Sequence, residues 1–120
     1  MILVDTGVWI RFFRGEDQAR KVSDLVLENR VILHPYVRGE LLLGGLSQKN
    51  ENLLQALTSC NLADMENLYQ FISSRKLTGC GIGLVDAALL SSAVEKQASI
   101  WTFDSALTDC AQQCDCSYTP

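Results

Sequence analysis

A chain of 120 residues with 48 % hydrophobic and 20 % charged residues has the composition of an ordinary globular protein and is long enough for one domain over residues 1–120. Its net charge of −4 at pH 7 has the wrong sign for a protein whose main task is to coat nucleic acid. It has neither an apolar run long enough to span a membrane nor the basic and apolar segments of a signal peptide, so we expect a cytoplasmic protein without a membrane partner.

The five cysteines predict free thiols, because an odd number in a chain without an export signal does not suggest a disulfide framework. Three of them, Cys110, Cys114 and Cys116, gather near the end of the sequence, where a zinc site is the alternative. That alternative is less favoured, since a structural zinc site takes four ligands, usually as two well-separated pairs.

The first apolar run, Ile2–Val4, predicts a central strand that is buried on both faces. Asp5 follows it directly, and parallel sheets bind their ligands outside the carboxyl ends of the strands. Asp5 is therefore the first candidate functional residue. The alternative is that Asp5 only caps the helix that begins near Gly7, because aspartate is favoured at such a boundary.

Strands and helices alternate along the rest of the chain. Helices are predicted at 8–13, 17–29, 36–44, 53–57, 65–74 and 84–94, and strands at 31–33, 99–102 and 117–118, with 61–63 as a weak edge strand or a connector. Gly79 to Gly83 form a loop without the spacing of a dinucleotide-binding motif. The alternation predicts an α/β fold with a parallel sheet.

Three further acids occupy positions like that of Asp5. Glu40 shares a helix face with Val37 and Leu41, where an unpaired carboxylate is costly. Asp86 lies in the first turn of an almost wholly apolar helix, where the helix dipole contributes about 0.3–1 kcal/mol, less than the cost of burying a lone carboxylate. Asp104 follows the strand that ends at Thr102 and precedes a helix from Ser105.

These four acids, Asp5, Glu40, Asp86 and Asp104, are called the acidic quartet below. In a parallel sheet with right-handed crossovers, the ends of strands and the starts of the following helices lie at one edge, so Asp5, Asp86 and Asp104 are expected to meet there, and Glu40 reaches them if its helix starts at that edge. Four adjacent carboxylates repel one another unless hard cations balance them, and oxygen ligands suit Mg²⁺ or Mn²⁺. Such ions activate water for an in-line phosphoryl displacement.

The segments Ile2–Ile10, His34–Leu41, Gly81–Leu90 and Trp101–Asp104 together resemble the PIN-domain family, and more closely the VapC-type toxins of bacterial toxin–antitoxin modules. The resemblance implies a three-layer α/β/α fold with a central, mainly parallel sheet. It also implies an Mg²⁺- or Mn²⁺-dependent endoribonuclease that forms a homodimer and is silenced by a cognate antitoxin. Metal coordination and catalysis then fall to the acidic quartet, and a metal-activated water cleaves RNA to leave a 3′-hydroxyl and a 5′-phosphate.

Several other residues have an expected role near the quartet. In a two-metal arrangement Asp5 would bridge the ions, and Thr6 and Thr102 could orient the carboxylates or water, or simply be a cap and a strand residue. Asp109 is a possible fifth acid, with a solvated helix position as the favoured alternative. The candidate RNA contacts are Arg38, Arg11, Arg14, Arg75 and Lys76, of which the last two are better explained as surface charges.

The aromatic residues Trp9, Phe12 and Phe13 could receive the antitoxin, although at least two of them are expected in the core. A turn role before Pro35 is favoured for His34 over catalysis. Two other functions stay open. A metal-binding module could act through a partner without catalysis. A phosphatase of the haloacid-dehalogenase type is disfavoured, because it requires a second aspartate at the position of Gly7.

Overall fold

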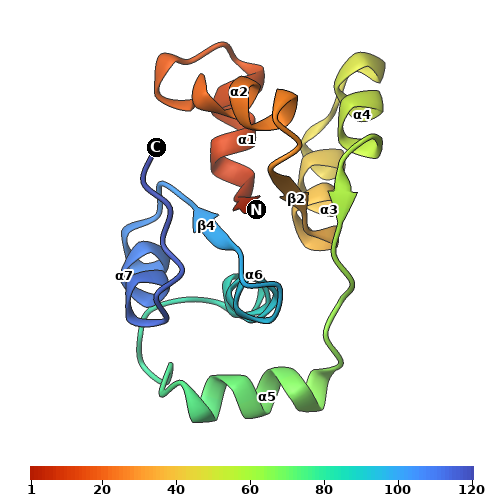
Figure 1. Ribbon diagram of the computed structural model, residues 1–120. Coiled ribbons are helices and arrows are strands. Elements are labelled where there is room, and N and C mark those ends of the chain that lie inside the picture. Colours follow the sequence, from red (N-terminus) through yellow and green to blue (C-terminus); the bar gives the residue numbers. More distant parts are fainter.

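The computed structural model describes residues 1–120 and contains one parallel sheet of four strands in the order β3-β2-β1-β4. The strands are β1 (Ile2–Val4), β2 (Val31–Leu33), β3 (Thr58–Ser59) and β4 (Ser99–Trp101). The strand β1 pairs with both β2 and β4, so the prediction of a central first strand is confirmed. Figure 1 shows how the helices surround this short sheet.

The helices alternate with the strands along the chain. They are α1 (Thr6–Phe13), α2 (Lys21–Leu27), α3 (Pro35–Gly44), α4 (Gln48–Gln55), α5 (Met65–Ser74), α6 (Leu84–Glu95) and α7 (Ser105–Gln113), with a 3₁₀ helix η1 (Asp17–Ala19) before α2. In Figure 1, α1 and α2 lie on one side of the sheet and α6 on the other, with α5 beyond α6. The three-layer α/β/α prediction is therefore confirmed.

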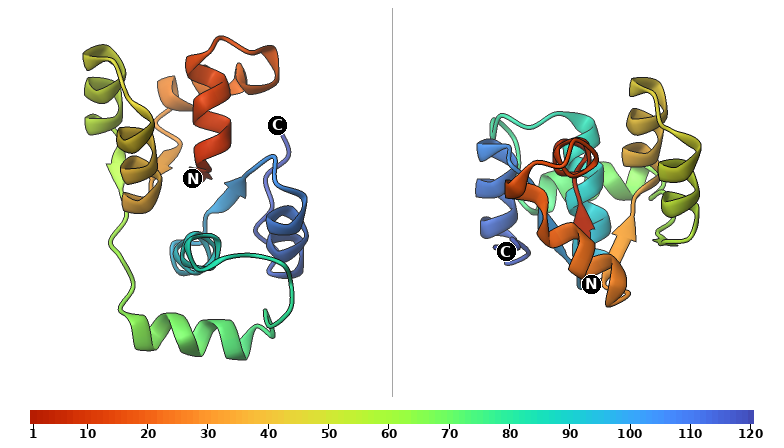
Figure 2. Two further views of the ribbon diagram at one scale, coloured as in Figure 1. Left: turned by 180° about the vertical axis from the view of Figure 1, so that it is seen from behind. Right: turned by 90° about the horizontal axis from the view of Figure 1, so that it is seen from above.

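The strand order reverses at β1, so the junction of β1 and β4 is a topological switch point. The chain first adds β2 and β3 on one side of β1, then returns through α5 and α6 to place β4 on the other side. In open parallel sheets, ligands bind at such a switch point, outside the carboxyl ends of the two strands. The views in Figure 2 show β4 and the start of α1 meeting at this junction.

The core explains why α6 is apolar on nearly every side. The helix contacts β1 and β4 on one side and α5 on another, so it has little contact with water. Its residues Ala87 to Leu90 and Ala93 are buried, as are all three residues of β1. A helix that is hydrophobic all round belongs in the interior, as its sequence predicts.

Three local predictions differ from the structure. The expected helix 17–29 is divided into η1 and α2, because the buried Ala19, Val22 and Leu25 recur every three residues, a spacing that suits 3₁₀ winding at its start. The edge strand is β3 rather than Asn61–Ala63, and its two residues are polar and exposed, so no apolar pattern marks it. The expected final strand is a single bridge between Ile100 and Ser117.

The structure contains no helix with both the length and the apolar character of a membrane span. All five cysteines are free, as predicted.

His34 lies in the interior and caps α3. Its ring is fully buried, and Nδ1 accepts a hydrogen bond of 3.0 Å from the backbone N–H of Tyr36. The proton of the neutral ring is therefore on Nε2, which has no hydrogen-bond partner. Burial lowers the pKa of His34 from 6.5 to about 4. The turn role predicted for this residue takes the form of a helix cap.

We expect the burial of His34 to make the protein less stable as the pH falls from 6.5 towards 4. In this range the unfolded histidine takes up a proton that the folded one does not, so the free energy of unfolding decreases with falling pH. The full effect is on the order of 3 kcal/mol. Urea unfolding of the wild type and of His34→Asn, which keeps a capping acceptor but cannot titrate, should give a steeper pH dependence for the wild type. Equal slopes would contradict the prediction.

We expect Leu89→Ala to lower the free energy of unfolding by about 2–5 kcal/mol, because Leu89 is fully buried in the core beside the sheet. Leu43→Ala is the matched control, since this leucine is also helical but 91 % exposed and its loss should change stability by less than about 0.5 kcal/mol. Urea unfolding monitored by circular dichroism measures both. Similar losses for the two variants would mean that α6 does not form the core described here.

Candidate active site

Asp5 is held at the switch point by both carboxylate oxygens. Its Oδ1 accepts a hydrogen bond of 2.8 Å from the backbone N–H of Thr6, and its Oδ2 accepts one of 2.7 Å from the hydroxyl of Thr102. Asp5 also donates its own N–H to the carbonyl oxygen of Trp101, which joins β1 to β4 at this point. Asp5 therefore caps α1, as the alternative interpretation predicts. Each of its carboxylate oxygens can still accept a further hydrogen bond or bind a cation.

Glu40 reaches the same region from α3. The hydroxyl of Thr6 donates a hydrogen bond of 2.7 Å to Glu40 Oε1, so the first residue of α1 contacts the carboxylate directly. The predicted placement of Glu40 on a buried face is wrong. Val37 and Leu41 are buried, whereas Glu40 is exposed, so its desolvation does not mark it as functional. What brings it to the site is the packing of α3 against α1 and the bond from Thr6.

Asp104 and Thr102 complete the junction from the β4 side. Asp104 caps α7, with its Oδ1 accepting a hydrogen bond of 2.8 Å from the N–H of Leu107. Its own N–H donates to Thr102 Oγ1 at 3.1 Å. Thr102 therefore binds Asp5 with its proton and Asp104 with its oxygen, and the two acids share one hydroxyl between them.

The acids of the quartet act on one another electrostatically. Burial raises the pKa of the Asp5 carboxyl, the threonine hydrogen bonds oppose this rise, and the charges of Glu40 and Asp104 add to it. Burial also raises the pKa of Asp86, and the charges of the other three acids raise it further, against a hydrogen bond from the backbone of Gly83. The four acids are therefore close enough to influence one another, with Asp5, Asp86 and Asp104 at strand or helix ends and Glu40 within α3.

The quartet has no basic partner to balance it. The ion pairs of the protein are Arg20–Asp17, Lys21–Asp24 and Arg30–Glu28, and none of them includes a quartet acid. Partly buried carboxylates that repel one another favour a cation, and carboxylate oxygen is the ligand that Mg²⁺ and Mn²⁺ prefer. The donor set therefore fits a hard divalent cation in its chemistry.

The arrangement of these donors is not that of a finished metal centre. No three aspartate, glutamate, histidine or cysteine side chains stand in positions that would already hold a metal ion. Asp5 accepts two hydrogen bonds, whereas Glu40 and Asp104 are exposed and each side chain accepts one. A cation at this site would have to draw the exposed carboxylates inward.

The remaining candidate residues are one acid, Asp109, and the arginines considered as RNA contacts. Asp109 is exposed on α7, and its charge is not among those that act on Asp5 or Asp86. Arg14 lines a cavity of about 310 Å³ between α1 and α3 together with Glu40. Arg38 lines a different cavity beside β3, and Arg75 stacks on Phe71 of α5. Arg38 as an RNA contact stays a prediction.

The aromatic residues of α1 are largely core residues, as expected. Trp9 is fully buried, and Phe12 and Phe13 are partly buried against the core. Phe13 also lines the cavity that contains Glu40 and Arg14. One aromatic residue near the quartet was not singled out from the sequence. Phe103 is 37 % exposed directly before Asp104, and residue type alone does not distinguish an exposed phenylalanine from a core one.

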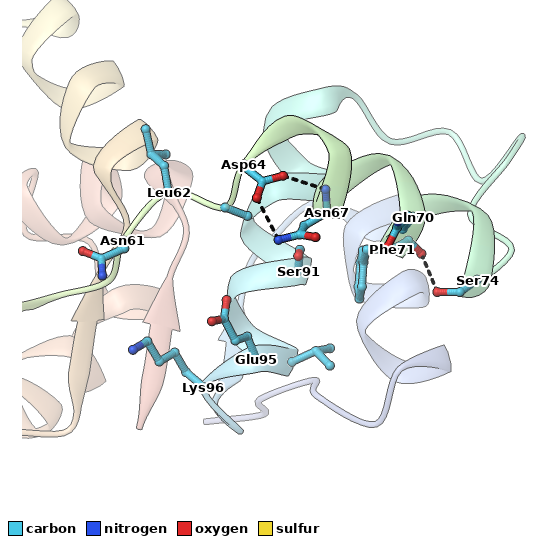
Figure 3. A pocket seen from close by; sticks show the side chains of 12 residues that line it. Asn61, Leu62, Asp64, Asn67, Gln70, Phe71, Ser74, Ser91, Glu95 and Lys96 are labelled. Carbon is cyan, nitrogen blue, oxygen red and sulfur yellow. Dashed lines mark hydrogen bonds between the residues drawn. The ribbon is translucent and has the colours of Figure 1, made fainter.

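The largest groove of the protein lies elsewhere. It has a volume of about 740 Å³ between α5 and α6, and Figure 3 shows Asn61, Asp64 and Lys96 among its lining residues. Asp64 uses both carboxylate oxygens to bind Asn67 and so caps α5. No member of the quartet lines this groove, so size does not identify the functional site.

A parallel α/β sheet with acids gathered at its switch point is an arrangement that the PIN fold provides, and residues 2–112 match the PIN domain family. The chain belongs to the PIN domain family. It is 39 % identical over 110 residues to "Ribonuclease VapC32" of Mycobacterium tuberculosis, in strain CDC 1551 / Oshkosh and in strain H37Rv alike. The match covers 89 % of this chain and 87 % of that protein, which confirms the predicted kinship with the VapC group.

A solved structure has the same fold. The crystal structure of FitAcB from Neisseria gonorrhoeae superposes with a TM-score of 0.67 and covers 98 % of this chain and 95 % of that chain. The two sequences are 22 % identical, so this likeness concerns the fold alone.

We expect Asp86→Asn to stabilise the protein at neutral pH in a buffer without divalent cations. Burial and the other three acids disfavour the charged carboxylate, and asparagine removes that charge while keeping an acceptor for the backbone of Gly83. The gain in unfolding free energy should exceed the change of about 0.5 kcal/mol that a surface substitution produces. Asp109→Asn, an exposed aspartate on a helix, is the control. A loss of stability in Asp86→Asn would mean that its charge is compensated in the fold.

Proposed function

We propose that this chain is a metal-dependent endoribonuclease that acts as the toxin of a toxin–antitoxin module. The observation that supports the proposal is the acidic quartet, whose carboxylates come from four separate elements, act on one another electrostatically and form no ion pair. Kinship with a protein named as a ribonuclease supports RNA as the substrate. The predicted homodimer stays a prediction.

The quartet supplies the ligands in this proposal. Asp5 would hold the cation from the centre of the junction, and Glu40, Asp86 and Asp104 would do so from the surrounding helices. A divalent cation, when bound there, would activate water and stabilise the charge that develops at the phosphorus, with a 3′-hydroxyl and a 5′-phosphate as products. Mg²⁺ and Mn²⁺ suit a site made of oxygen ligands.

The two threonines position the acids. Thr102 holds Asp5 Oδ2 at 2.7 Å and fixes the backbone of Asp104, while Thr6 holds Glu40 Oε1 at 2.7 Å. These hydroxyls fix the direction in which the carboxylates present their remaining lone pairs. These two hydrogen bonds support the positioning role that we propose for Thr6 and Thr102.

The cavity between α1 and α3 suits the expected antitoxin. Ile10, Phe13, Leu41 and Leu46 give it an apolar lining, and Glu40 and Arg14 line it as well. An antitoxin segment with apolar side chains and one basic residue would fill this cavity and neutralise part of the quartet. Such a segment would block the site by charge as well as by volume.

We expect Asp5→Asn to reduce RNA cleavage by more than about 100-fold and to abolish growth inhibition, because the amide removes a negative charge from the centre of the quartet. Asparagine can still accept the hydrogen bond from Thr6, so the fold should persist. Cleavage of labelled total RNA and growth of cells that express the chain without its antitoxin are the two measurements. Treatment of the wild type with EDTA should stop cleavage, and Mg²⁺ or Mn²⁺ should restore it.

Asp109→Asn is the matched control for this experiment, because it removes an acid outside the quartet and should leave both activities unchanged. Circular dichroism establishes that both variants are folded. If Asp5→Asn were folded and still toxic, the chain would be a binding module that acts through a partner.

A further inference from the structure

The turn after β4 presents an aromatic ring beside the quartet. Trp101 is buried, whereas Phe103, two residues later, is 37 % exposed and contacts the Trp101 ring edge-on with centroids 6.0 Å apart. The hydrogen bond from the N–H of Asp104 to Thr102 Oγ1 closes the turn around Phe103. The ring is therefore held at the surface between a residue that binds Asp5 and a member of the quartet.

A guanidinium group covers this ring. The Arg11 guanidinium carbon lies 4.5 Å from the centroid of Phe103, and Arg11 Nη1 donates a hydrogen bond of 2.8 Å to Gln18 Oε1. The stack and the bond to Gln18 together fix the plane of the guanidinium. Arg11 forms no ion pair with any carboxylate, although its stacking partner directly precedes Asp104. The guanidinium is therefore held beside the residue that precedes Asp104, without a carboxylate partner of its own.

The fold gives little reason for this pair. The contacts with Trp101 and Arg11 leave the ring of Phe103 37 % exposed, and a guanidinium gains more from a carboxylate partner than from the neutral amide of Gln18. The combination of an exposed aromatic ring, a flat fixed cation and a neighbouring acidic site instead suits a flat ligand that carries a phosphate. Unpaired nucleobases have this chemistry, because they stack on aromatic rings and on arginine planes.

We propose that Phe103 and Arg11 form a stacking platform for one unpaired nucleobase next to the phosphate that the quartet attacks. The inference rests on the proposed ribonuclease function and adds to it that Phe103 and Arg11 are the residues that contact a base. A base inside a duplex is stacked on its neighbours and does not reach the ring. Arg11 contributes its plane to the stack and its charge to the adjacent phosphate.

The test is the affinity for RNA probes that differ only in their bases. Fluorescein-labelled ten-nucleotide oligoadenylate, an abasic strand with the same phosphates and a duplex of the same length are titrated with the full chain as Asp5→Asn, which prevents cleavage. Oligoadenylate should bind more tightly than either other probe. Phe103→Leu in this background should weaken oligoadenylate binding by roughly 5- to 150-fold and leave the abasic strand unaffected.

Three further variants control the result. Phe103→Trp should keep the preference for oligoadenylate, and Arg11→Lys should keep the affinity for the abasic strand while losing part of that preference. Tyr69→Leu is the matched control, because Tyr69 is an aromatic residue with 50 % exposure on α5 and should have no effect. If Phe103→Leu does not fold, the comparison of Phe103→Trp and Arg11→Lys with the parent still decides the question.

Equal binding of oligoadenylate and the abasic strand by the parent would overturn the platform. Equal effects of Phe103→Leu and Tyr69→Leu on the affinity for oligoadenylate would also overturn it. Different results would overturn the ribonuclease function and the stacking platform. Base-dependent binding without cleavage by the wild type would overturn the ribonuclease function, and cleavage with base-independent binding would overturn the platform alone.

Discussion

The structure depends on the junction of β1 and β4, where the hydroxyl of Thr102 binds the side chain of Asp5 and the backbone of Asp104. The strand order reverses here, so the carboxyl ends of two neighbouring strands lead into different helices and leave a crevice between them. The bond from Asp5 N–H to the Trp101 carbonyl closes the sheet at the same level. Both the helix that carries Arg11 and the turn that carries Phe103 start from this point.

The junction also concentrates charge that the fold does not neutralise. A protein selected for stability alone would place a lysine or arginine beside Asp5 and Asp86, yet none of the ion pairs includes a quartet acid, and Arg11 and Arg75 stack on aromatic rings instead. The backbone and threonine hydrogen bonds offset part of the repulsion. Local rules are most often broken at functional sites, where stability is sacrificed for chemistry.

The fold was predictable wherever the hydrophobic pattern was strong. The strands Ile2–Val4, Val31–Leu33 and Ser99–Trp101 are apolar runs because both faces of a parallel sheet are covered, and the acids follow from their positions at strand and helix ends. The strand Thr58–Ser59 was not predictable, because its two residues are polar and exposed and so lack the apolar pattern by which a strand is identified. Glu40 was identified for the wrong reason, because whether its helix face is buried depends on packing against α1. Phe103 was missed because exposure is a tertiary property.

The acidic quartet and the Arg11–Phe103 pair place opposite demands on an RNA ligand. The quartet repels phosphate as long as its charge is uncompensated, and the single guanidinium at its edge cannot offset four carboxylates. A cation held by the quartet would remove this repulsion, so the affinity for the cation and the affinity for RNA must be coupled with the same free energy in both directions. Stacking on Phe103 involves no such repulsion, because a base is neutral. In this arrangement the base contact can select an unpaired nucleotide, and the phosphate can approach the acids only when their charge is balanced.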